Sequence, residues 1–208
     1  MKRIKIIPVF SIILLFVFVS PVYAHTTSQI GVLEQTYHTN PNYQDYYVGG
    51  EEVGWSIDET LHTNGTSITY SFAITDPYLE TAYKVYAIEG ASKWNGIVNI
   101  TNKLDGTGKG IIKTYNEENS GTVDRFRGAY TDANGHLTSW IIEMNRSYNV
   151  TSTTLAHEFG HVIGLNDLYA SKNTNKLMYG YSSRSVSSPP YYRLKGLTQY
   201  CVGPYFAL

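Results

Sequence analysis

HEFGHVIGLND, residues 157–167, is the stretch that decides how the rest of the chain is interpreted. His157 and His161 are four residues apart, so a helix would place both imidazoles on one face, where they can bind the same metal ion. Glu158 would point beside the ion, within reach of a water molecule. The spacing therefore predicts a metal site on a helix. Two incidental helix histidines are the alternative, but H-E-x-x-H arises by chance only about once in a hundred chains of this length.

The residues around this motif favour a helix with one buried face. Apolar side chains fall on the side away from the histidines, at Leu155, Phe159 and Val162. Thr151 or Ser152 is suited to cap the first turn, because a hydroxyl oxygen can accept a hydrogen bond from a backbone N–H there. Gly164 is suited to end the helix, because glycine tolerates the left-handed conformation in which the chain reverses.

Asp167, three residues after Gly164, is the candidate for a third metal ligand. A chain that reverses at Gly164 can bring Asp167 back towards the ion, and carboxylate oxygens are competent zinc ligands. The alternative is that Asp167 only caps a local turn, as aspartate often does. We expect Asp167 to bind the ion together with His157 and His161.

The pattern HExxHxxGxxD at residues 157–167 resembles the extended zinc signature of the metzincin metallopeptidases. Its last position is aspartate instead of histidine, and in this respect it is similar to the snapalysin-type enzymes. KLMYGY, residues 176–181, resembles the Met-turn of the same enzymes, with a wording similar to that of matrixins, which implies that Met178 packs beneath the metal. The strong motifs cover residues 151–181, and upstream of them the resemblance lies in the order of the elements.

The resemblance implies a catalytic zinc ion held by His157, His161 and Asp167, with a fourth position open to water. Glu158 would take the proton of that water as it attacks the peptide carbonyl, and would then deliver it to the departing amine. We therefore expect a zinc-dependent endopeptidase that acts on proteins or peptides. Two other classes stay open. A binding module on the same scaffold would have no need of Glu158, and a structural zinc protein would need a fourth ligand.

The resemblance also indicates where a substrate would bind. In metzincins the peptide pairs in extended form with the edge strand that precedes the active-site helix. The matching segment here is RGAYT, residues 127–131, whose central residues are Gly128, Ala129 and Tyr130. Tyr181 would line the pocket on the leaving-group side and donate a hydrogen bond to the oxyanion. Because the chain has 19 tyrosines, plain packing is an equally good interpretation of Tyr181.

The chain as a whole predicts an α+β fold, with a twisted mixed β-sheet, an active-site helix and a loop-rich C-terminal part. Runs rich in β-branched and aromatic residues predict strands within residues 66–74, 96–102, 110–116, 127–131 and 137–145. A first helix is expected to begin at Asp76, a good N-cap followed by Pro77, and to reach Trp94. The helix of the metal motif spans residues 151–164, and residues 191–201 are expected to form a short third helix.

The first 24 residues have the features of a signal peptide that is removed on export. A short basic segment precedes an apolar run over residues 6–19, and Ala24 ends a small-residue cleavage site. An uncleaved membrane anchor is disfavoured, because the run is shorter than the ~20 apolar residues that a spanning helix needs. Residues 25–53 are expected to be an N-terminal arm or short pro-segment, and residues 54–208 the metallopeptidase catalytic domain.

The composition limits the partners and the compartment. Removing three of the 16 Lys and Arg residues with the signal peptide leaves 13 against 17 Asp and Glu, a net charge of −4 that argues against nucleic acid. Cys201, the single cysteine, can form no internal disulfide and is expected to be a small buried side chain. We expect a secreted, extracellular monomer with no stable membrane insertion after signal removal.

Two turn-forming clusters offer oxygen atoms to a structural calcium ion. They are DGTGKG, from Asp105, and DANGH, from Asp132. Ordinary surface turns are the simpler interpretation of both clusters, since aspartate and glycine are typical turn residues. Calcium is therefore a secondary expectation beside the zinc ion.

Overall fold

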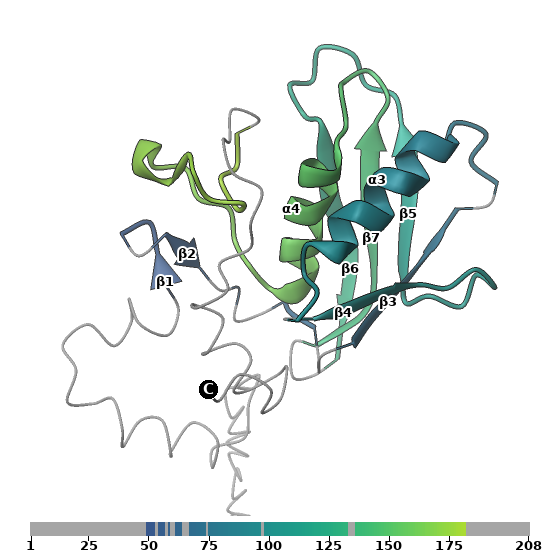
Figure 1. Ribbon diagram of the computed structural model, residues 1–208, viewed down its shortest axis with the longest axis horizontal. Coiled ribbons are helices and arrows are strands. Elements are labelled where there is room, and N and C mark those ends of the chain that lie inside the picture. The colour runs from purple at the N-terminus through teal and green to yellow at the C-terminus, as the bar shows by residue number, and fades with distance from the viewer. Residues whose placement is uncertain are drawn as a thin grey trace, which may run out of the picture.

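The computed structural model describes residues 49–181, apart from residues 53, 57, 59–60, 64–66, 74, 97 and 133–135. The predicted signal peptide and short third helix lie outside the described residues, and so does Cys201, whose side chain was predicted to be buried. Within the described part, a five-stranded sheet carries two helices, and a small hairpin and a loop-rich segment lie beside them (Figure 1).

The sheet is mixed. Across it the strands follow the order β4 (Asn99–Asn102), β3 (Ser67–Phe72), β5 (Gly110–Tyr115), β7 (Leu137–Asn145) and β6 (Asp124–Thr131). The first four strands run parallel, and β6 pairs antiparallel with β7 at the edge. Parallel neighbours need a crossover connection, which α3 (Thr81–Ser92) supplies between β3 and β4. The α+β class and all five predicted strands are confirmed.

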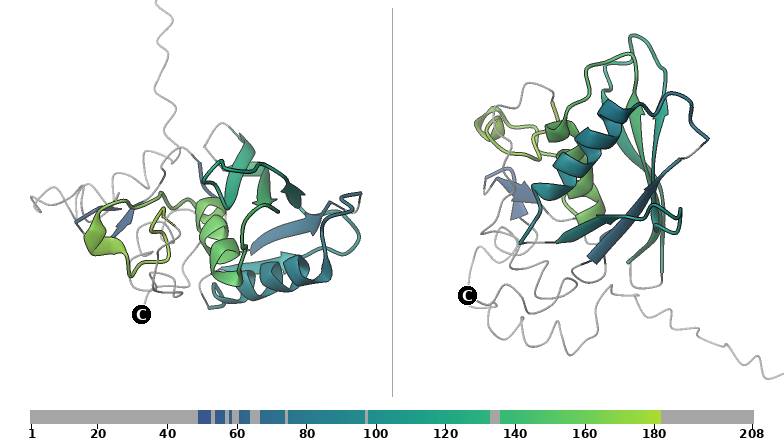
Figure 2. Two further views of the ribbon diagram at one scale, coloured as in Figure 1. Left: turned by 90° about the horizontal axis from the view of Figure 1, so that it is seen from above. Right: turned by 45° about the vertical axis from the view of Figure 1, so that its right-hand side comes forward.

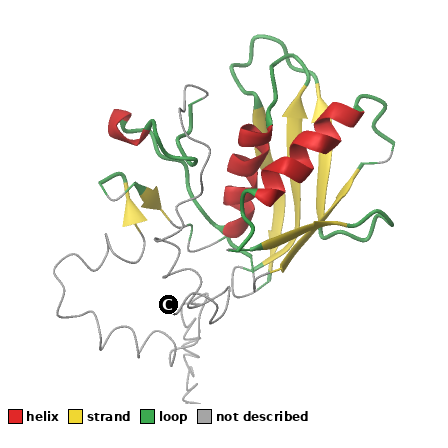
Figure 3. Ribbon diagram, viewed as in Figure 1, coloured by secondary structure: helices red, strands yellow, loops and turns green. Residues whose placement is uncertain are grey.

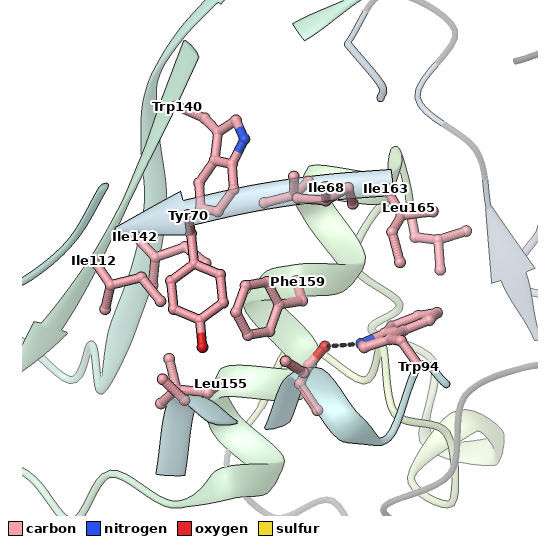
Figure 4. Close-up of a cluster of buried hydrophobic side chains, with 14 of the residues drawn as sticks. Ile68, Tyr70, Trp94, Ile112, Trp140, Ile142, Leu155, Phe159, Ile163 and Leu165 are labelled. Atoms are coloured by element: carbon pink, nitrogen blue, oxygen red, sulfur yellow. Dashed lines mark hydrogen bonds between the residues drawn. The ribbon is translucent and has the colours of Figure 1, made fainter. Parts of the chain in front are cut away.

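Both helices pack on the same face of this sheet, α3 beside α4 (Ser152–Ile163), as the views in Figures 2 and 3 show. The core lies between the two layers (Figure 4). Tyr70 of β3 and Trp140 of β7 flank Phe159 of α4, with ring centroids 5.4 and 6.3 Å from the Phe159 ring. Each such burial contributes about 1.5–3 kcal/mol. The apolar side of α4 is therefore held to the sheet, and the predicted division of its faces is confirmed.

Small residues let α3 approach α4 closely. Ala87, Gly90 and Ala91 form the buried side of α3. A Cβ on Gly90 would lie 2.9 Å from the backbone nitrogen of Ala156, so no larger residue fits there without separating the helices. At the end of α3, the buried Trp94 Nε1 donates to the carbonyl oxygen of Ala156 at 2.9 Å (Figure 4). These contacts fix α4 to its neighbour α3, in addition to its packing on the sheet.

The first helix begins later than the sequence predicts. α3 starts at Thr81, with Glu80 as N-cap, so the prediction of an N-cap at Asp76 is wrong. The Asp76 carboxylate accepts from the backbone nitrogen of Tyr78 at 2.9 Å and from the backbone nitrogen and hydroxyl of Thr114 in β5, at 2.7 and 2.6 Å. Asp76 thus closes a turn and ties it to the sheet. In the described part of the chain, no helix is both long and apolar enough to span a membrane.

Candidate metal centre

The helix that carries the metal motif is defined at both ends. Thr151 is the N-cap: its hydroxyl oxygen accepts from the backbone nitrogen of Thr154, and its own backbone nitrogen donates to the Thr154 hydroxyl at 3.1 Å. Gly164 ends the helix in the left-handed conformation, with φ 111°. Both ends agree with the sequence predictions. The chain reverses at Gly164, as a return of Asp167 to the helix requires.

The three predicted ligands meet at one point. Oδ1 of Asp167 lies 3.0 Å from Nε2 of His157 and 3.6 Å from Nε2 of His161. The two imidazole rings are perpendicular, with centroids 4.8 Å apart, so their Nε2 atoms approach the same place from different directions. The sequence left open that Asp167 only caps a local turn. In the structure the turn after Gly164 brings the Asp167 carboxylate to the two histidines.

Backbone carbonyl groups orient both histidines. Nδ1 of His157 lies 2.8 Å from the Leu177 oxygen, and Nδ1 of His161 lies 2.7 Å from the Leu165 oxygen. A carbonyl oxygen only accepts, so each Nδ1 carries the proton and donates it. In a neutral imidazole this leaves the Nε2 lone pair free to bind a metal, which is the usual second interaction of metal-binding histidines.

The donor set fits a divalent cation. Two Nε2 lone pairs and a carboxylate oxygen face one another, an arrangement that is repulsive by itself and that a cation between them would stabilise. Burial raises the pKa of Asp167, but a hydrogen bond from His157 and the positive charges of the two histidines in their protonated form, together with the Tyr169 hydroxyl, lower it by more. A positive charge beside this carboxylate, such as a bound cation would supply between neutral imidazoles, therefore favours its charged form. Two imidazoles and one carboxylate are a donor set that zinc accepts.

Tyr169 holds the second oxygen of the Asp167 carboxylate. Its hydroxyl donates to Oδ2 of Asp167 at 3.0 Å, which leaves Oδ1 directed at the histidines. No sequence motif points to Tyr169. Its only signal is its place two residues after the candidate ligand, and tyrosine is too common in this chain for that place to stand out.

Met178 packs against the helix between the two histidines. It is 2% exposed, and its sulfur occupies the space beside Gly160, the residue that precedes His161. The neighbouring residue is Leu177, whose carbonyl group orients His157. Met178 therefore lies close to the histidines, as the resemblance to the Met-turn implies. That residues 176–181 form a matrixin-like Met-turn stays a prediction.

An open cleft of about 820 Å³ lies over the donor atoms. Glu158 lines it, is 4% exposed, and has Oε1 4.0 Å from Nε2 of His157. Tyr181 lines the same cleft at its rim, 55% exposed, with its ring against those of Tyr169 and Tyr179. A substrate entering from solvent would therefore meet Glu158 and the three ligands together.

One wall of the cleft is formed by residues 121–126, a loop and the first part of the edge strand β6. The predicted substrate segment, Gly128, Ala129 and Tyr130, belongs to the second part of the same strand, where the pairing with β7 shifts register between Arg127 and Tyr130. These three residues are not among those that line the cleft. The part of the edge nearest to the ligands thus lies upstream of the predicted segment.

The two turns considered for calcium are held by their own hydrogen bonds. Oδ1 of Asp105 accepts from the backbone nitrogen of Thr107 at 3.0 Å, and Oδ1 of Asp132 accepts from that of His136 at the same distance. Among the described residues, the one cluster of three or more histidine, cysteine or acidic side chains placed for a metal is His157, Glu158 and His161, beside which Asp167 lies. Calcium thus has no support in the described residues.

The site has two histidines and a buried glutamate on one helix, and an aspartate that turns back to them in an open cleft. These features are typical of a metal-dependent hydrolase. Over residues 67–195 the sequence matches the model of the Streptomyces extracellular neutral proteinase (M7) family, and the chain belongs to this family. Membership confirms the resemblance to snapalysin-type metallopeptidases and implies a catalytic metal.

One relative is an extracellular small neutral protease of Streptomyces sp. (strain C5). It is 35% identical to the chain over 123 residues, which cover 58% of this chain and 51% of the relative. The chain therefore spans about half the length of this relative. Among solved structures, myroilysin is 15% identical, with a TM-score of 0.39 and coverage of 69% of this chain and 96% of that one.

Proposed function

We propose that this chain is a secreted zinc-dependent endopeptidase that hydrolyses peptide bonds in proteins. The observation that carries the proposal is the convergence of Nε2 of His157, Nε2 of His161 and Oδ1 of Asp167 beside Glu158 in an open cleft. Membership of a proteinase family supports the same reaction class. The relative from Streptomyces is named as extracellular, which agrees with the signal peptide expected from residues 1–24.

The residues of the site divide the chemistry between them. His157, His161 and Asp167 would hold a zinc ion, which supplies, when bound, a Lewis acid that activates water and polarises the scissile carbonyl group. The Glu158 carboxylate takes a proton from the attacking water and passes it to the nitrogen of the leaving amine. Its burial beside the histidines suits this role, because the groups around it keep the carboxylate next to the reacting atoms.

We propose that the substrate binds in extended form along β6. An edge strand leaves one row of backbone N–H and C=O groups for pairing with a peptide. Such pairing recognises the peptide mainly through its backbone and less through its side chains. Residues 121–126 are the part of this edge that lines the cleft, and residues 128–130 would continue the pairing away from the ligands. Tyr181, which lines the cleft at its rim, would donate a hydrogen bond to the developing oxyanion.

The test is cleavage of casein by the purified full-length chain, with zinc or with a chelator, beside the variant Glu158→Gln. Glu118→Gln serves as the control, because Glu118 is an exposed glutamate outside the cleft lining. We expect chelator-sensitive cleavage by the unmodified chain and by Glu118→Gln. In Glu158→Gln we expect the rate to fall about 100-fold or more, because general base catalysis contributes about 10²–10⁴-fold.

Zinc content separates the possible outcomes of this test. Glu158→Gln should bind one zinc ion per chain, as the unmodified protein does, so that its loss of activity reports the proton transfer alone. Cleavage that survives in Glu158→Gln would remove Glu158 from the mechanism, and cleavage that survives the chelator would remove the metal. Zinc binding with no cleavage of any protein substrate would favour the catalytically silent binding module instead.

A further inference from the structure

A short hairpin from the N-terminal part of the described chain lies beside the loop that carries Asp167. β1 (Gly49–Gly50) pairs antiparallel with β2 (Trp55–Ser56). Figures 1 and 2 show this hairpin apart from the five-stranded sheet and next to the segment that follows α4. The hairpin therefore contacts the loop that carries Asp167.

The hairpin holds the chain just before Asp167. The carbonyl oxygen of Ser56 accepts from the backbone nitrogen of Asn166 at 2.9 Å, and the Asn166 side chain reaches the Ser56 hydroxyl at 3.3 Å. Two residues on, the backbone nitrogen of Asp58 donates to the Gly164 oxygen at 2.7 Å. The backbone that leads from the helix end to Asp167 is thus fixed to Ser56 and Asp58.

Glu51 holds the chain just after Asp167. Its carboxylate accepts from the backbone nitrogen of Tyr169 at 2.5 Å and from that of Ala170 at 3.0 Å. The side-chain amide of the buried Asn173, which ends the 3-10 helix η1 (Ser171–Asn173), donates to the Glu51 carboxylate at 2.6 Å and to its carbonyl oxygen at 2.8 Å. Hydrogen bonds to an ionised carboxylate are about twice as strong as neutral ones. Glu51 therefore binds three groups within five residues of loop.

The neighbouring glutamate provides a natural contrast. The side chain of Glu52 is 81% exposed and pairs with Lys172, itself 43% exposed. An exposed ion pair of this kind contributes little, about 0–1 kcal/mol. The two adjacent acidic residues thus touch the same loop in different ways, Glu51 through the backbone around Asp167 and Glu52 through a surface charge.

We infer that Glu51 is a positioning residue for the third metal ligand. By fixing the backbone of Tyr169, it sets the Tyr169 hydroxyl against Oδ2 of Asp167 and so directs Oδ1 at the histidines. The inference deepens the proposed function and rests on it. It also assigns residues 49–58 to the metal-binding domain, so any processing that leaves the site intact must cut upstream of Gly49 and not after residue 53.

The first test is the zinc affinity of the full-length chain, measured by competition with a chromophoric chelator. Glu51→Ala should bind zinc about 10- to 100-fold more weakly, the usual effect of removing a group that orients a metal ligand. Glu51→Gln retains one acceptor oxygen and should show a smaller loss. The control Glu52→Ala should stay within about twofold of the unmodified chain, as surface substitutions do.

A double-mutant cycle with Asp167→Ala separates positioning from a general loss of stability. If Glu51 acts through Asp167, Glu51→Ala should not weaken zinc binding further once the Asp167 carboxylate is absent. An equal loss in both backgrounds would overturn the inference, and so would unchanged affinity in Glu51→Ala. Circular dichroism of each variant without metal shows whether the fold persists. If Glu51→Ala does not fold, the same cycle is run with Glu51→Gln.

Two further outcomes keep this inference distinct from the proposed function. An unmodified chain that binds no zinc would remove both. A chain that binds zinc and cleaves casein, and whose Glu51 variants bind zinc equally well, would remove only the positioning role. Mass spectrometry of the secreted active protein gives an independent result: we expect an N-terminus upstream of Gly49, and an active form that begins after Glu51 would overturn the inference.

Discussion

The sulfur of Met178 fills the space that Gly160 leaves by having no side chain. A Cβ on Gly160 would lie 2.3 Å from Sδ and 2.9 Å from Cε of Met178. The residue before Met178 supplies the carbonyl oxygen that accepts from His157. The packing of this methionine and the orientation of the His157 imidazole therefore depend on the same short segment.

Replacing Gly160 by alanine should make the protein less stable. Alanine in a helix interior is favoured over glycine by about 1 kcal/mol. Here the new methyl group would displace Met178, and overpacking costs about 1–3 kcal/mol. We expect a net loss of about 1 kcal/mol in the free energy of unfolding, measured by urea denaturation. In a Met178→Ala background the penalty should disappear, so additive losses would contradict this account.

Gly90→Ala should lower the free energy of unfolding more than Gly160→Ala does, because the new methyl group would meet backbone atoms. The added Cβ would lie 2.9 Å from the nitrogen of Ala156 and the oxygen of Ser152, which cannot turn aside as a methionine tip can. We expect a net loss of about 1–3 kcal/mol despite the gain in helix propensity. Glu89→Ala, on the exposed side of the same helix, is the control and should change stability by less than about 0.5 kcal/mol.

The stability of the sheet should fall in acid because of Glu143. This carboxyl group is 6% exposed and lies 2.8 Å from Arg125 Nε and 3.0 Å from Lys113 Nζ. Burial raises the pKa of Glu143, but its hydrogen bonds with Arg125 and Lys113 lower it by more. A carboxyl group whose pKa is lower in the folded chain contributes stability that is present above its unfolded pKa and lost as the pH falls through its folded pKa.

The window for this loss lies below the ordinary glutamate pKa of 4.5. We expect the free energy of unfolding to decline as the pH is lowered from 5 through this window, and to decline less steeply in Glu143→Gln. The measurement is urea denaturation of both proteins at matched pH values. Parallel pH profiles for the two proteins would show that Glu143 does not contribute as described.

Asp167→His should alter the pH dependence of catalysis. A carboxylate adds a negative charge beside the cation and weakens its power to acidify water, whereas a neutral imidazole does not. In kcat/KM against pH, the acidic limb should therefore move to lower pH in Asp167→His. Zinc content measured on the same samples ensures that the profile reports a loaded site. An unchanged profile would sink this explanation of the aspartate.

How much the sequence predicts depends on how far apart the interacting residues are. The cap at Thr151, one of two candidates, and the left-handed end at Gly164 were predicted correctly, because each residue acts on the helix it adjoins. The role of Asp167 as a ligand stays a prediction, although its carboxylate does return to the histidines. Asp76 was misassigned because its carboxylate is taken by Thr114, 38 residues away, which no local pattern reveals. β7 was predicted with its bounds, since it is a run of β-branched and aromatic residues that follows a turn-forming cluster.

The edge of the sheet was harder to predict. β6 begins at Asp124, three residues before the start predicted from the sequence. The sequence did not predict these residues as strand, because charged residues such as Asp124 and Arg125 are typical of a loop. Arg125 is accommodated in the strand by Glu143 on β7 and by the ring of Tyr115, which lies 4.0 Å from its guanidinium carbon. Both partners come from other strands. Glu51 is the extreme case, since 118 residues separate it from Tyr169.

The large sequence separation between Glu51 and Tyr169 affects the order in which contacts form when the chain folds. The three proposed zinc ligands come from eleven consecutive residues, so one helix and the turn after it are enough to bring them together. Their brace arrives only after a loop of more than a hundred residues has closed, which is a slow, entropically costly step. On the proposed role of Glu51, a nascent chain would bind its ion weakly at first, and tight binding would follow only once Glu51 and Tyr169 have met.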